Sequence, residues 1–124
     1  MSRSILDEAH IHPAIRGIIA NNHADIVREV QAAIAENDIV VVGMAQNPFP
    51  KKAKKLLHQQ RLSYKYLEYG NYLSGWRRRN ALKMWTGWPS FPMVFVKGVL
   101  VGGANDLQKL VESGEFARLL GAKV

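Results

Sequence analysis

The sequence has 124 residues and no cysteine, which excludes disulfide bonds, iron–sulfur ligation and catalysis by a thiol of this chain. Hydrophobic residues make up 48% and charged residues 22%, a balance typical of one compact domain, and no apolar run approaches the ~20 residues of a membrane span. The formal net charge of +7 favours anionic ligands without identifying one.

The N-terminal part of the chain predicts two helices and a buried strand. Pro13 suits a first helical position and favours a helix over 13–20. A second helix begins near His23 and ends at 36–37, because apolar residues recur there at intervals of three and four. The β-branched run 39–43 then indicates a strand that is buried on both faces, as in a parallel sheet.

The middle of the chain predicts a loop, a helix and a second strand. Pro48 and Pro50 remove two backbone donors and disfavour helical angles in the residues before them, so we expect a loop over 46–50. The lysine-rich segment 51–58 has an apolar face and predicts a helix. Alternation of aromatic and polar residues over 62–69 indicates a strand.

The C-terminal half predicts a helix, a hairpin and a closing helix. Its expected elements are a helix over 76–85, strands over 92–96 and 99–101, a helix over 107–112 and a helical stretch over 116–120. Asn105 or Asp106 is expected to cap the helix at 107.

This order of elements predicts an α/β fold with a four-stranded mixed sheet flanked by helices. The first two strands and their helical crossover form a parallel unit, and the hairpin adds antiparallel partners. We expect residues 1–23 to form an N-terminal helical extension and residues 24–124 to form the domain.

Residues 88–107 read Trp-Pro-Ser-Phe-Pro-Met-Val-Phe-Val-Lys-Gly-Val-Leu-Val-Gly-Gly-Ala-Asn-Asp-Leu, and residues 113–116 read Ser-Gly-Glu-Phe. This sequence closely resembles the monothiol branch of the glutaredoxin family. The resemblance extends over about residues 24–120 and implies a thioredoxin-like fold. It also implies the family's role in cell redox homeostasis.

The family places its cysteine motif directly before a helix that corresponds to the lysine-rich segment of this chain. That alignment puts Asn47, Pro48, Phe49 and Pro50 on the four motif positions, with Asn47 in the place of the nucleophile. Neither an amide nor a pyrrolidine ring can attack a disulfide or hold a cluster, so no catalytic residue is expected. We interpret Asn47 as a structural cap for the following helix.

The resemblance also implies a groove for glutathione or an extended peptide. Arg79 matches an arginine that pairs with a glutathione carboxylate, and Phe91–Pro92 matches a cis-proline peptide bond. The segment from Gly103 to Asp106 matches the part that holds the γ-glutamyl end beside a helix N-terminus. The predicted groove residues are Asn47, Phe49, Arg79, Ser90, Phe91, Pro92, Gly103, Asn105 and Asp106.

Two positions depart from the family and remove charge from this groove. Met44 stands where the family has a lysine, and Asn105 stands where an aspartate is common. Two functions remain open. One is a pseudoenzyme, a non-redox binding module that holds glutathione, an extended peptide or a protein partner. The alternative is a glutathione-dependent thiol–disulfide oxidoreductase that relies on an external thiol. The lack of a thiol and of a histidine–carboxylate base favours the binding module.

Other features of the sequence favour no further ligand. Three successive arginines at 77–79 cannot share one helix face, so we expect solvated helix surfaces and no nucleic-acid platform. The four histidines stand at no recognised metal-site spacing, and neither a required cofactor nor a metal is expected. The polar, acidic start of the chain lacks the apolar region of a secretory signal, which predicts a cytoplasmic protein without membrane association.

Overall fold

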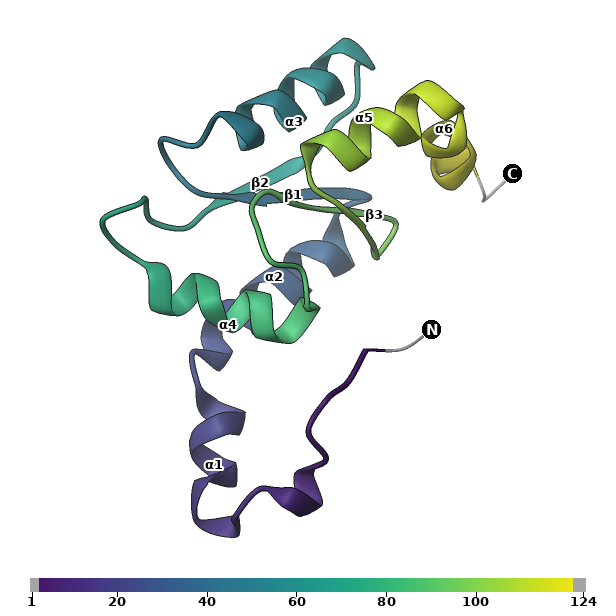
Figure 1. The fold of residues 1–124 in the computed structure, drawn as a ribbon. Coiled ribbons are helices and arrows are strands. Elements are labelled where there is room, and N and C mark those ends of the chain that lie inside the picture. Colours follow the sequence, from purple (N-terminus) through teal and green to yellow (C-terminus); the bar gives the residue numbers. More distant parts are fainter. Residues whose placement is uncertain (1–2, 122–124) are drawn as a thin grey trace.

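The computed structural model describes residues 3–121, and its centre is one mixed sheet of four strands (Figure 1). In the order β2-β1-β3-β4, β1 pairs with β2 in parallel and with β3 in antiparallel fashion, and β4 completes a hairpin with β3. The predicted four-stranded mixed sheet is therefore confirmed. The strands are β1 (Ile39–Gly43), β2 (Lys65–Glu68), β3 (Met93–Val96) and β4 (Val99–Gly102).

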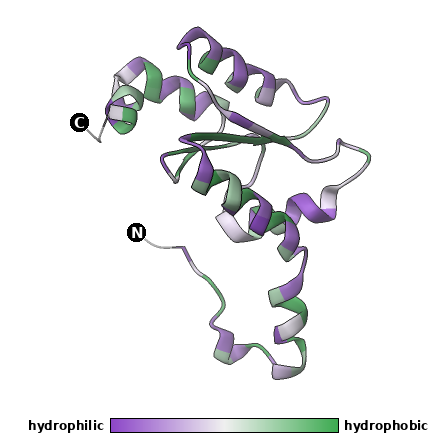
Figure 2. Ribbon diagram, turned by 180° about the vertical axis from the view of Figure 1, so that it is seen from behind, coloured by the Kyte–Doolittle hydropathy of each residue, from purple (hydrophilic) through white to green (hydrophobic). Residues whose placement is uncertain are grey.

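Helices cover both faces of this sheet. One face packs against α2 (Ala24–Glu36) and α4 (Trp76–Thr86). The other packs against α3 (Pro48–Gln59) and α5 (Ala104–Ser113), with α6 (Glu115–Leu120) following α5. Figure 2 shows the apolar strands enclosed between these two helical layers.

The central strand β1 supplies side chains to two separate cores. Val40 and Val42 belong to the cluster beneath α2 and α4, whereas Ile39 and Val41 belong to the cluster beneath α3 and α5. Because successive side chains of a strand point to opposite faces, a continuous β-branched run fills both cores at once. All of β1 is buried, as its sequence predicts.

Helix α3 begins at Pro48, so the prediction of a loop through residue 50 is wrong. The first N–H groups of a helix have no partner within the helix, and therefore Pro48 and Pro50 remove no helical hydrogen bond. Asn47 is the N-cap, and its side chain accepts a hydrogen bond of 2.9 Å from the Phe49 backbone N–H. The interpretation of Asn47 as a cap is confirmed.

Two other element boundaries differ from the prediction. β2 covers only 65–68, because its ladder with β1 runs from Val40 to Gly43 and leaves no partner for residues 62–64. α5 begins at Ala104 with Gly103 as N-cap, so the expected cap at Asn105 or Asp106 is wrong. Asp106 still contributes to the helix start, since its Oδ2 accepts from the Gly103 N–H at 3.0 Å.

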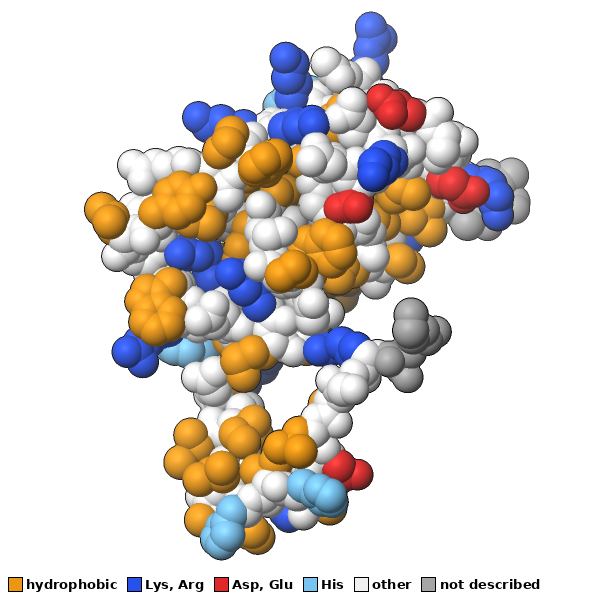
Figure 3. Space-filling model, viewed as in Figure 1, with side chains coloured by type: hydrophobic (Ala, Val, Ile, Leu, Met, Phe, Trp, Pro, Cys, Tyr) orange, Lys and Arg blue, Asp and Glu red, His pale blue; other side chains and the backbone are white. Residues whose placement is uncertain are grey.

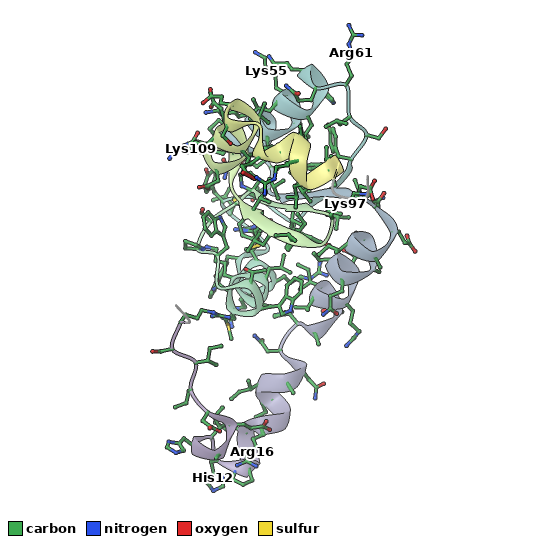
Figure 4. All side chains as sticks on the ribbon, turned by 90° about the vertical axis from the view of Figure 1, so that its right-hand side faces the viewer. His12, Arg16, Lys55, Arg61, Lys97 and Lys109 are labelled. Atoms are coloured by element: carbon green, nitrogen blue, oxygen red, sulfur yellow. The ribbon has the colours of Figure 1, made fainter. Side chains whose placement is uncertain are left out.

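The N-terminal segment is helical, as predicted, and it extends away from the sheet as an arm (Figure 1). It consists of the 3₁₀ turn η1 (Glu8–His10) and helix α1 (Pro13–Asn21), neither of which has a buried residue. His12 and Arg16 lie at the opposite end of the molecule from Lys55 and Arg61 (Figure 4). The arm returns toward the end of α4, where a Cβ built on Gly87 would lie 2.8 Å from the Arg3 Cζ atom. Among residues 3–121, no helix has the length and apolarity to cross a membrane.

Candidate functional site

A shallow groove of about 210 Å³ lies between the start of α3, the loop before β3 and the start of α5. Phe49 forms one wall, the loop before β3 forms a second, and the first turn of α5 forms the polar end. The lining residues are Phe49, Trp88, Ser90, Phe91, Pro92, Gly103, Ala104, Asn105 and Asp106. Most of the predicted groove residues thus come together from three segments that are far apart in the sequence.

The peptide bond between Phe91 and Pro92 is cis, as the resemblance implies. The Phe91 side chain is only 6% exposed and packs into the core beneath α2 and α4. Ser90 is exposed beside it. This loop therefore presents mainly backbone and a small hydroxyl to the groove, while its aromatic ring anchors it to the core.

Asn47, which the resemblance aligns with the family's nucleophile, is a capping amide. Asn47 is 9% exposed, and its Oδ1 atom is already bonded to the Phe49 N–H. Pro50, which the resemblance aligns with the fourth motif position, packs against β1, where a Cβ built on Gly43 would lie 2.9 Å from the Pro50 Cβ atom. Phe49 is 47% exposed. Asn47 therefore supports the helix start and does not line the groove.

Arg79 does not line the groove either, contrary to the expectation from the resemblance. Its Nη1 atom donates to the carbonyl oxygens of Tyr69, at 2.9 Å, and Ser74, at 2.7 Å. The side chain is 6% exposed, and this burial lowers the pKa of the guanidinium from its usual value. Arg79 thus holds the loop between β2 and α4 in place.

The close approach to Arg79 depends on two glycines of that loop. Gly70 and Gly75 have φ angles of 64° and 77°, a region that favours glycine. A Cβ on Gly70 would lie 2.4 Å from the Ser74 carbonyl oxygen and 2.9 Å from Arg79 Nη1. The resemblance assigned Arg79 to the groove from its position in the sequence alone. The two glycines were the sequence signal that Arg79 is instead surrounded by a tight loop.

A residue that sequence reasoning missed contacts the polar end of the groove from outside its lining. Lys52 of α3 donates from Nζ to the Oδ1 atom of Asn105 at 2.6 Å. The two residues are 53 positions apart, so their proximity depends on the packing of α3 against α5. Beside them, the carboxylate of Asp106 accepts from the Gly103 N–H.

One donor at this site has no partner among the described residues. The Nε1 atom of Trp88 is buried and makes no hydrogen bond. It lies close to the start of α5, since a Cβ built on Gly103 would be 3.9 Å from it. A buried donor without a partner carries a desolvation cost of about 1–3 kcal/mol.

The three arginines at the start of α4 have three separate environments. Arg77 lies over the ring of Trp76, 4.7 Å from its centroid. Arg78 pairs with Asp25 at 3.2 Å, and Arg79 is buried in the loop contact. Figure 3 shows basic side chains in separate groups on this face of the molecule, interrupted by hydrophobic ones. Within residues 3–121, no three acidic, cysteine or histidine residues are grouped as a metal site.

This strand order, with a cis-proline loop facing the start of the helix after β1, defines a thioredoxin-fold protein. The chain belongs to the glutaredoxin family, since its residues 39–101 match the glutaredoxin family model. A glutaredoxin-like protein of Dictyostelium discoideum is 47% identical over 100 residues, which cover 81% of each chain. Mitochondrial glutaredoxin-2 of Homo sapiens is 32% identical over 99 residues, and the alignment spans 57% of that protein.

Solved structures show the same fold. Oxidised glutaredoxin 2 of Chlamydomonas reinhardtii superimposes with a TM-score of 0.69 at 31% identity, over 80% of this chain and 94% of that one. A buckwheat glutaredoxin–glutathione complex superimposes with a TM-score of 0.71 at 24% identity, over 81% and 91% of the two chains. The chain described here is a member of this family that contains no cysteine.

Proposed function

We propose that this protein is a non-redox binding module that uses the groove to hold glutathione or an extended peptide. One observation carries the proposal: the groove between α3, the cis-proline loop and α5 is formed, while Asn47, which the resemblance aligns with the nucleophile, has its oxygen bonded to a backbone N–H. The walls for a peptide ligand are thus present without the atom that would react with it.

The chemistry of disulfide exchange supports this proposal over the oxidoreductase alternative. Exchange requires attack by a thiolate on a sulfur atom, and the chain has no sulfur nucleophile. An enzyme that relied on an external thiol would need a base to activate it. Among the described residues that line the groove, the titratable one is Asp106, and its carboxylate already accepts from Gly103.

The composition of the groove supports a peptide with an ionic end as its ligand. Phe49 and Pro92 provide apolar walls, and the start of α5 provides polar groups at one end. Extended peptides bind in this way, with backbone hydrogen bonds and one end held by charge. The buckwheat relative that was solved with glutathione makes this tripeptide the first candidate.

The cytoplasmic location remains a prediction.

Titration of the ¹⁵N-labelled protein with glutathione tests the proposal. We expect amide shifts at millimolar glutathione to concentrate on Phe49, Ser90 and the residues from Gly103 to Asp106. Parallel titrations with oxidised glutathione and with a library of short peptides that have free C-termini test the same surface. Unchanged spectra with glutathione and with all peptides would refute a binding role for this groove.

A further inference from the structure

Lys52 differs from the other lysines of α3 in what it contacts. Its Nζ atom crosses from α3 to α5 and donates to Asn105 Oδ1 at 2.6 Å. Lys54 instead lies over the ring of Tyr66, 4.0 Å from the ring centroid. Lys51 and Lys55 are exposed, and Figure 4 shows Lys55 pointing away from the body of the molecule. Lys52 therefore places one positive charge of α3 beside Asn105, at the edge of the polar end of the groove.

The groove has few other sources of positive charge. Met44 is 7% exposed within the core, and the guanidinium of Arg79 is held by two backbone carbonyls. Among the described lining residues, Asp106 carries the formal charge, and that charge is negative. A ligand carboxylate at this end therefore depends on the Lys52 ammonium and on the N–H groups of the first turn of α5 for favourable electrostatics.

We propose that Lys52 is the specificity-determining residue of this groove and binds the α-carboxylate of a γ-glutamyl end. In the free protein its ammonium donates to the neutral amide of Asn105. When the ligand binds, the same ammonium donates to the ligand carboxylate, which is a stronger acceptor because it is charged. The inference rests on the proposed function, since it assigns a carboxylate partner within the proposed glutathione groove.

The acidic neighbour explains why an amino-acid end fits better than a lone carboxylate. Asp106 follows Asn105 directly, and its negative charge would repel an isolated carboxylate such as the glycine end of glutathione. The γ-glutamyl end carries both an ammonium and a carboxylate. Such an end can face Lys52 and Asp106 together with opposite charges matched.

Calorimetric titration of three proteins with two ligands tests this assignment. The proteins are the wild type, Lys52→Met and the matched control Lys55→Met, which removes the same charge from an exposed position of the same helix. The ligands are glutathione and γ-aminobutyryl-cysteinylglycine, which lacks the α-carboxylate. We expect Lys52→Met to weaken glutathione binding about tenfold and to prefer glutathione over the analogue less than the wild type does, because it loses a charge-assisted hydrogen bond at a half-exposed site and keeps only the N–H groups of α5.

The controls separate charge recognition from damage to the fold. Lys55→Met should bind both ligands as the wild type does, and Lys52→Arg should retain the preference for glutathione. Thermal unfolding monitors each variant, and Lys52→Gln replaces Lys52→Met if the latter does not fold. Equal glutathione affinity in Lys52→Met and the wild type would overturn this inference and leave the proposed function intact. If the wild type does not bind glutathione, both the proposed binding of glutathione in this groove and the inference about Lys52 are overturned.

Discussion

Asn47 Oδ1 accepts a hydrogen bond of 2.9 Å from the backbone N–H of Phe49, across the first turn of α3. The resemblance to glutaredoxins aligns Asn47 with the nucleophile of that family. The residue that replaces the reactive group is thus bonded into the scaffold. Its effect on the protein is expected in stability and not in catalysis.

The first prediction concerns that cap. Asn47→Ala should lower the free energy of unfolding by about 1 kcal/mol, because N-cap side chains contribute roughly 0.5–2 kcal/mol. Asn47→Asp keeps an acceptor and should remain close to the wild type. Urea unfolding followed by circular dichroism measures both variants. Equal stability of Asn47→Ala and the wild type would show that the cap makes no energetic contribution.

The second prediction concerns restored thiol chemistry. The wild type should reduce hydroxyethyl disulfide at the background rate of glutathione alone. Asn47→Cys combined with Pro50→Ser should raise the rate above background, because a thiolate at a helix N-terminus is stabilised and reactive. Asn47→Ser with Pro50→Ser serves as the control for structural changes. Wild-type turnover above background would support the oxidoreductase alternative.

The third prediction concerns the buried arginine. Arg79→Met leaves the carbonyl oxygens of Tyr69 and Ser74 without their donor, and each unsatisfied buried group costs about 1–3 kcal/mol. We expect a loss of about 2–3 kcal/mol in the free energy of unfolding. Arg77→Met, at an exposed position of the same helix, loses only the contact with the Trp76 ring and should change stability by less than about 1 kcal/mol. Similar losses in the two variants would contradict a structural role specific to Arg79.

The fourth prediction concerns alkaline pH. Burial raises the pKa of Tyr69, and its hydrogen bond to Glu29 adds to the rise. Burial also raises the pKa of Tyr66, with a further contribution from its bond to Glu68. The unfolded state loses these protons first, so the stabilising contribution is complete below about pH 10 and is lost as the pH rises above it.

Ultraviolet titration of tyrosinate absorbance measures this effect. A late component should remain above about pH 10 in the folded protein, and Tyr69→Phe and Tyr66→Phe should each remove part of it. The difference in stability between the wild type and Tyr69→Phe should decrease over the same alkaline range. A titration in which all tyrosines ionise together near about pH 10 would contradict the assignment.

The fifth prediction concerns the N-terminal arm. Deletion of residues 1–22 should leave a folded domain, because α1 contributes no buried residue. Deletion of residues 1–30 also removes Ile26 and Val30, which are both 0% exposed, and should prevent folding, since each large core side chain contributes about 2–5 kcal/mol. Thermal unfolding of the two truncated proteins measures the difference. Loss of folding in the protein that lacks residues 1–22 would show that the arm supports the core.

The sequence by itself determined the element order, the thiol-free character and most of the groove. Hydrophobic periodicity is a local property, so it predicted β1 and α2 correctly. The resemblance of the segment from Trp88 to Leu107 predicted that Phe91, Pro92 and Gly103 line the groove. The tertiary structure alone decided which polar groups meet. The loop carbonyls that hold Arg79 and the approach of Lys52 to Asn105 arise from packing between elements far apart in the chain, where no local pattern specifies a partner.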